Sequence, residues 1–108
     1  MAISSATLRA VTAELYERSL KGIPGDARAA LERARGAETV TLGRETIGLM
    51  IESADAARAE GQLVCTDVGV PTYSVRVGSL ARFEGDVRRP IVEGLAQGAE
   101  VMGPPILK

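Results

Sequence analysis

The spacing of apolar residues predicts a helix at the start of the chain. Between Leu8 and Leu15 apolar side chains recur every three or four positions, the repeat of one face of an α-helix. Ser4 or Ser5 can cap its first turn, because a serine hydroxyl accepts hydrogen bonds from N–H groups that the helix leaves unpaired. We expect this helix to end near Gly22.

Turn residues divide the following stretch into two more predicted helices. The sequence Ile23-Pro24-Gly25 interrupts the first helix, and a second helix with a narrow face of small residues is expected from Asp26 to Gly36. A third should begin with Thr41 as its cap and end at Gly61, since glycine readily takes the left-handed conformation that closes a helix. Its predicted inner face consists of Ile47, Met50, Ile51, Ala54 and Ala57.

Beyond Gly61 the pattern changes to one that is typical of strands. Leu63–Val64 is a short apolar run, and Thr72–Val77 alternates polar and apolar residues with the period of a β-strand. Tyr73, Val75 and Val77 would then share the core side. Because proline has no N–H group to donate, Pro71 is excluded from a central strand position.

A fourth helix is predicted near the end of the chain, starting at about Asp86 with Pro90 in its first turn, where proline is tolerated. The combined pattern predicts an α+β fold in one domain over 1–108: three N-terminal helices, two short β-strands flanking a turn that contains Cys65, and one C-terminal helix. Two strands alone make a marginal sheet, so we expect strands from a partner chain or from residues beyond Lys108 to complete it. The inner face of the last helix is predicted to comprise Ile91, Val92, Leu95, Ala96, Ala99 and Met102.

Charge and composition narrow the functional classes. The formal net charge is -1, with both signs interspersed and no basic tract, so a nucleic-acid partner is not expected. No apolar run approaches the roughly 20 residues that cross a bilayer, which predicts no membrane span. The single cysteine cannot form an internal disulfide, and no secretory signal is recognisable, so we expect a cytoplasmic protein.

The stretch Gln62–Gly78 contains the residues that are candidates for catalysis or metal binding. It holds Cys65 and, two residues later, Asp67, in a chain that contains no histidine. The cysteine can be a buried small hydrophobe, a nucleophile without a histidine partner, or one metal ligand among several supplied from elsewhere. Asp67 can cap its own turn or act as an acid or base. Arg44, Arg58 and Arg76 are expected to be solvated, and Arg76 is the best candidate of the three for binding an anion.

The run Ala56–Gly78, AARAEGQLVCTDVGVPTYSVRVG, resembles a segment of class I fumarases and the related tartrate dehydratase alpha subunits. In that family a helix rich in alanine and glutamate leads through a glycine into a Cys-Gln-Asp-Thr-Gly motif and then a strand. Ile23-Pro24, Ala29-Ala30-Leu31 and Ile91-Val92-Glu93-Gly94 are also similar to the family. The resemblance covers nearly the whole chain and corresponds to the N-terminal part of the family's alpha region.

The resemblance implies an iron–sulfur hydro-lyase that acts on a small dicarboxylate. Cys65 would be one of three thiolate ligands of a 4Fe-4S cluster, whose open iron acts as a Lewis acid. Asp67 would be catalytic, and Thr66 with Asp67 would bind substrate. Thr66 replaces the motif's glutamine and Val68 its threonine, so a long amide donor becomes a short hydroxyl and a polar turn residue is lost.

Three hypotheses follow. The chain can be a fragment or small subunit of a fumarase-like hydro-lyase, completed by a second polypeptide in a homo- or hetero-oligomer. It can be a non-catalytic descendant that serves as a binding or oligomerisation module, which the changes at Thr66 and Val68 favour. It can also be a cysteine-dependent enzyme of another type, which requires a depressed pKa at Cys65.

Overall fold

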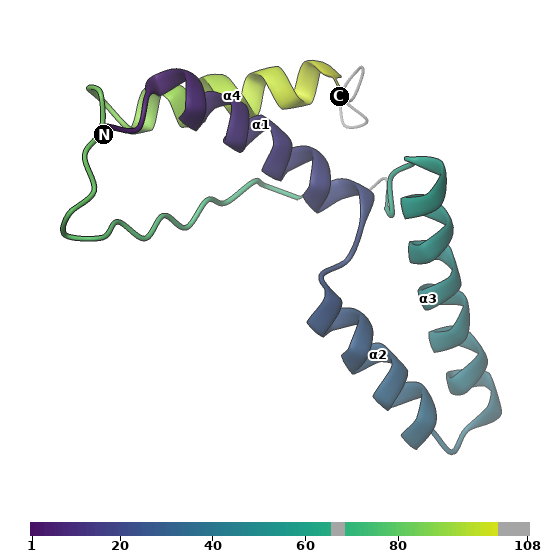
Figure 1. Cartoon of the computed structure of the whole chain (residues 1–108). Helices are drawn as coiled ribbons and strands as arrows, with labels where there is room; N and C mark the ends of the chain where they lie inside the picture. Colours follow the sequence, from purple (N-terminus) through teal and green to yellow (C-terminus); the bar gives the residue numbers. More distant parts are fainter. Residues whose placement is uncertain (66–68, 102–108) are drawn as a thin grey trace. The chain divides into compact units, whose positions relative to one another are not determined.

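The computed structural model describes residues 1–65 and 69–101. These residues form four α-helices: α1 (Ser5–Lys21), α2 (Gly25–Ala37), α3 (Thr41–Glu60) and α4 (Arg88–Val101). Figure 1 shows the helices along the chain. The described residues divide into two compact units, one of residues 1–18 with 69–101 and the other of residues 19–65. No helix within them is long and apolar enough to span a bilayer.

The predicted α+β fold is wrong, because the described residues are helical and contain no β-sheet. Among the described residues neither Leu63–Val64 nor Thr72–Val77 has a strand partner, and the single β-bridge there pairs Ile3 with Phe83. Val75 and Val77, predicted to face a core, are 53% and 57% exposed. Alternation favours an extended backbone, but a strand also needs a neighbour with which to exchange hydrogen bonds. Within the described chain this segment has none.

The first unit is held together by close packing of α1 on α4. Gly94 and Gly98 lie one turn apart on α4 and are both buried. A Cβ atom at Gly94 would lie 2.4 Å from the carbonyl oxygen of Arg9 and 2.8 Å from the Cβ of Thr12. Thr12 is itself buried, so the inner face of α1 is centred on Thr12.

Of the apolar residues predicted to face inward on α1 and α4, Leu8, Ile91 and Leu95 are half-buried, several others are exposed, and Met102 lies outside the described residues. Val11 and Leu15 of α1 are 48% and 52% exposed, and Val92 of α4 is 58% exposed. Glycine and threonine allow the two backbones to approach more closely than larger side chains would. The smallest residues therefore occupy this interface, and several larger apolar residues face solvent.

The N-terminus and the loop before α4 complete the first unit. The N–H of Ile3 donates to the carbonyl of Arg82 over 2.8 Å, and the N–H of Glu84 donates to the carbonyl of Ile3 over 3.0 Å. The hydroxyl of Ser5 donates to the carbonyl of Glu84. These bonds attach the start of α1 to the loop that leads into α4.

The second unit is a hairpin of α2 and α3. Ile51, Ala54 and Ala57 of α3 are buried as predicted, whereas Met50 is 52% exposed. Glycine at the end of α3 is also confirmed, because Gly61 has φ 66° and ψ 24°. The expected cap of α3 is wrong, because Thr41 is the first helical residue and the flanking Val40 makes no side-chain cap. The expected cap of α1 is confirmed, because the N–H of Thr7 donates to the hydroxyl of Ser4 over 3.1 Å.

An ion-pair network joins the two helices of this hairpin. The guanidinium of Arg28 binds both carboxylate oxygens of Asp55, over 3.0 and 2.7 Å, and also contacts Glu32 over 2.5 Å. The hydrogen bond from Arg28 lowers the pKa of Asp55, with a smaller opposing effect of desolvation. Because α2 buries none of its residues, these polar contacts supplement a thin apolar interface.

Candidate functional site

The end of α3 determines where Cys65 lies. The N–H groups of Gly61 and Gln62 both donate to the carbonyl of Ala57, which closes the helix and turns the chain. Three residues after Gly61, the N–H of Val64 donates to the carbonyl of Leu20 over 2.9 Å. Cys65 follows this anchored position directly and is exposed.

The exposure of Cys65 excludes one of the three sequence-based interpretations. A cysteine that acts as a small hydrophobe would be buried in the core, and this one is not. Thr66 and Asp67, the predicted partners of Cys65, lie outside the described residues, as does Val68. The structure therefore tests the exposure of the thiol and not the arrangement of the whole motif.

The described residues provide too few ligands for a complete metal centre. Nowhere in residues 1–65 and 69–101 do three histidine, cysteine, aspartate or glutamate residues form a group that could hold a metal ion. Cys65 offers one thiolate, whereas zinc and iron–sulfur sites need several protein ligands. The described donor set thus fits a single ligand position of a cluster.

The three arginines considered from the sequence differ in what they bind. The guanidinium of Arg44 donates to the carbonyl of Glu38 over 2.8 Å, and that of Arg58 donates to the carbonyl of Ile23 over 3.3 Å. Arg76 lies exposed on the extended segment after the motif. All three arginine side chains are exposed, as predicted, and those of Arg44 and Arg58 also hold loops of the second unit.

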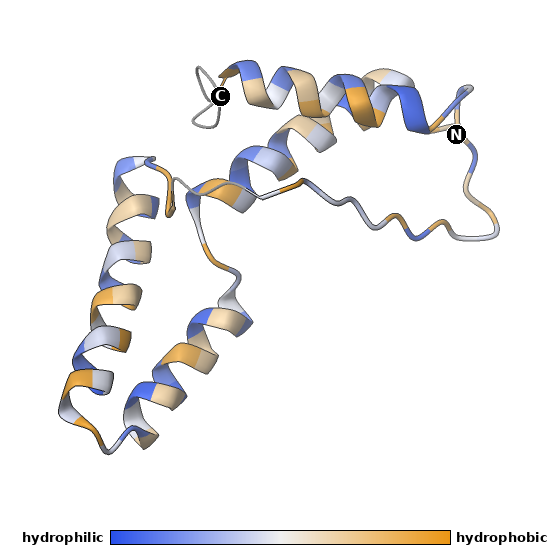
Figure 2. Cartoon of the chain, turned by 180° about the vertical axis from the view of Figure 1, so that it is seen from behind, coloured by the Kyte–Doolittle hydropathy of each residue, from blue (hydrophilic) through white to orange (hydrophobic). Residues whose placement is uncertain are grey.

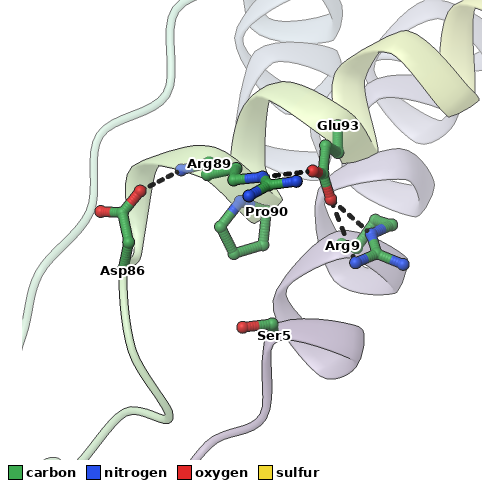
Figure 3. A pocket seen from close by; sticks show the side chains of 6 residues that line it. All are labelled: Ser5, Arg9, Asp86, Arg89, Pro90 and Glu93. Carbon is green, nitrogen blue, oxygen red and sulfur yellow. Dashed lines mark hydrogen bonds and ion pairs between the residues drawn. The ribbon is translucent and has the colours of Figure 1, made fainter.

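A polar cavity of about 260 Å³ lies between the first turns of α1 and α4 (Figure 3). Glu93 sits between two arginines: Arg9 Nη2 approaches its Oε2 to 3.0 Å, and Arg89 Nε donates to its Oε1 over 2.8 Å. The hydrogen bond from Arg89, together with the charge of Arg9, holds the pKa of Glu93 below its usual range despite some desolvation.

Asp86 closes the other side of this cavity by capping α4. Its carboxylate accepts hydrogen bonds from the N–H of Arg88 over 3.1 Å and of Arg89 over 2.9 Å. These bonds, that from Arg89 foremost, lower the pKa of Asp86. Two arginine and two carboxylate side chains line the cavity, so it has no charge excess that would attract an anion. We interpret it as a structural junction between the two helices.

Some of the contacts among these charged side chains can be predicted from the sequence. Arg89 and Glu93 stand four residues apart, the spacing of a stabilising ion pair on a helix. Asp86 was expected near the start of the helix. The contact of Arg9 with Glu93 had no such signal, because 84 positions of chain separate them.

The geometry thus presents one exposed thiol after a helix that a glycine closes, in a chain whose described part is helical. The family model described as fumarate hydratase (Fumerase) matches residues 9–103. The chain belongs to this family, which confirms the resemblance to class I fumarases. Class I fumarases generally depend on an iron–sulfur cluster. No curated protein and no solved structure matches the chain.

Proposed function

We propose that this chain is part of a fumarase-like hydro-lyase that reversibly hydrates a small dicarboxylate in the cytoplasm. It would be a fragment or small subunit that a second polypeptide completes, in a homo- or hetero-oligomer. The observation that carries the proposal is the family match over residues 9–103, which includes the exposed Cys65.

In this proposal Cys65 is one thiolate ligand of a 4Fe-4S cluster, and the second polypeptide supplies the remaining ligands. Exposure of the thiol supports this role, because a ligand completed from another chain must be accessible to it. When bound, the cluster would supply a Lewis-acidic iron for the hydroxyl group of the substrate. The chain's own contribution is to hold the thiol at the end of α3, anchored by the hydrogen bond of Val64.

Two neighbouring residues complete the proposed contribution of this chain. Asp67 would transfer a proton during hydration and contact the dicarboxylate, since a carboxylate is a common general base. Thr66 would donate a hydroxyl hydrogen bond to the substrate at the position where the family motif has glutamine. Both assignments come from the match of these positions to the motif.

The test uses the full chain co-expressed with the polypeptide encoded beside it. The complex is reconstituted anaerobically with ferrous iron and sulfide, and bound iron, visible absorbance and fumarate hydration are measured. Cys65→Ser should lower bound iron and abolish hydration. Asp67→Asn should keep the iron and lose turnover. Ser53→Ala, an exposed change on α3, is the matched control and should alter neither. Iron content and activity that survive Cys65→Ser would refute the ligand assignment.

A second candidate function is a non-catalytic module descended from this family. The ligand count favours it, because the chain has one cysteine and its described residues contain no group of three potential metal ligands. A module of this kind would be colourless after the same reconstitution, and its thermal stability would not depend on iron. A brown complex that hydrates fumarate would exclude it.

A further inference from the structure

The turn that leads from α3 to Cys65 is bonded on both sides to the connection between α1 and α2. Before the turn, Nη2 of Arg58 donates to the carbonyl of Ile23 over 3.3 Å. After the turn, the N–H of Val64 donates to the carbonyl of Leu20 over 2.9 Å. Figure 2 shows in orange the short apolar segment that follows α3. The same stretch of the second unit thus fixes the chain before and after the turn.

Both acceptors are carbonyl groups that the neighbouring helices do not use for their own hydrogen bonds. Leu20 lies in the last turn of α1, where the final four carbonyls have no partner within the helix. Ile23 precedes Pro24, whose carbonyl accepts from the N–H of Arg28 at the start of α2. The N–H groups of α2 therefore do not reach the carbonyl of Ile23, and an arginine side chain supplies the donor.

The guanidinium of Arg58 lies close to the backbone of this connection. A Cβ atom at Gly22 would lie 3.3 Å from both Nε and Nη2 of Arg58, so the absence of a side chain at Gly22 leaves room for the guanidinium. Arg58 itself belongs to the last turn of α3, three residues before Gly61, at which the chain turns with φ 66°. The side chain therefore joins the end of one helix to the connection between two others.

We propose that Arg58 is a positioning residue for the thiol of Cys65. Its hydrogen bond holds the connection against the end of α3, and the carbonyl of Leu20 in that connection holds Val64, the residue before Cys65. The inference rests on the proposed function, in which this thiol is a ligand of the cluster. Groups that orient a ligand from behind strongly affect how tightly a metal is bound.

This role is local, because other contacts hold the hairpin together. The ion pair of Arg28 with Asp55 joins α2 to α3 without Arg58. The inner face of α3 is formed by its buried residues Gly48, Ile51, Ala54 and Ala57. Loss of the Arg58 hydrogen bond should therefore loosen the turn and leave the packing of the hairpin in place.

The first test measures amide hydrogen exchange by NMR in the full chain. Arg58→Met keeps an apolar stem and removes the donor, so the N–H of Val64 should exchange about fivefold faster than in the unchanged chain. Arg58→Lys keeps a charged donor and should restore exchange to within about twofold. Arg44→Met is the matched control, because Arg44 also donates to a loop carbonyl, that of Glu38, at the other end of α3. It should leave exchange at Val64 unchanged.

The second test uses the complex reconstituted with the second polypeptide. Iron release to a ferrous chelator should be faster in Arg58→Met by a factor comparable to that at Val64, and unchanged in Arg44→Met. If the complex of the unchanged chain binds no iron, the proposed function is wrong. Exchange at Val64 then still decides the role of Arg58, so the two proposals fail separately.

Four outcomes would overturn the role of Arg58. Exchange at Val64 can be unaffected by Arg58→Met, or can rise as much in Arg44→Met. It can also rise equally at the buried Ala54 of α3, which would indicate a general loss of stability. Finally, an iron-loaded complex can release iron at the same rate with Arg58→Met as with the unchanged chain.

Discussion

Gly94 offers a sharp test of the packing that holds the first unit together. In Gly94→Ala the new Cβ would lie 2.4 Å from the carbonyl oxygen of Arg9 and 2.8 Å from the Cβ of Thr12. Real Cβ atoms essentially never approach other atoms within 3.0 Å, and the nearest atom belongs to the backbone of α1 and cannot rotate away. The two helices must therefore separate by roughly 1 Å to restore ordinary contact.

The expected free-energy change has two opposing parts. Overpacking of this kind costs about 1–3 kcal/mol, whereas replacing glycine by alanine inside a helix gains about 1 kcal/mol of helix propensity. The net expectation is a destabilisation of up to about 2 kcal/mol. For a domain of this size each kcal/mol lowers the melting temperature by about 4–8 °C.

The assay is thermal and urea unfolding followed by circular dichroism, with Gly36→Ala as the matched control. Gly36 lies in α2, and a Cβ there would meet nothing within 4 Å. This variant should therefore be stabilised by about 0.5–1 kcal/mol, from propensity alone. If Gly94→Ala were as stable as Gly36→Ala, the close contact of α4 with α1 would be wrong.

Two further predictions concern the first unit. Tyr73→Phe removes the hydroxyl that donates to the carbonyl of Thr12 and should cost about 0.5–1.5 kcal/mol in the free energy of unfolding; an unchanged urea midpoint would argue against that hydrogen bond. The pKa of Asp86 is lowered by hydrogen bonds from backbone N–H groups, that of Arg89 foremost. The stabilisation that Asp86 contributes to the folded state is therefore present above the usual aspartate pKa and is lost as the pH falls through the lowered pKa. Urea midpoints measured from neutral to acidic pH should decline less steeply in Asp86→Asn, and identical profiles would contradict this linkage.

Helix positions were largely readable from the sequence because their signals are local. Ile23 and Pro24 lie between α1 and α2, Pro90 lies in the first turn of α4, and Gly61 ends α3. Each signal acts through the conformation of a residue and its nearest neighbours. A helix also satisfies its own backbone hydrogen bonds within a few residues, so its existence depends little on the rest of the chain.

The strands were predicted wrongly for the complementary reason. The alternation in Thr72–Val77 correctly indicated an extended backbone, but the hydrogen bonds of a strand come from another segment. The residues of Thr72–Val77 do not indicate whether the same chain contains a second segment with which they can pair. The same limit applies to the salt bridge between Arg9 and Glu93, whose partners lie far apart in the sequence.

For the site, the sequence by itself determined the inventory: one cysteine, no histidine, and a motif that resembles the fumarase family. Only the tertiary structure decided that Cys65 is exposed and that small residues occupy the interface of α1 with α4. A residue's chemistry is a property of the residue alone. Its exposure depends on which other segments cover it, and that is settled by contacts between residues distant in the chain.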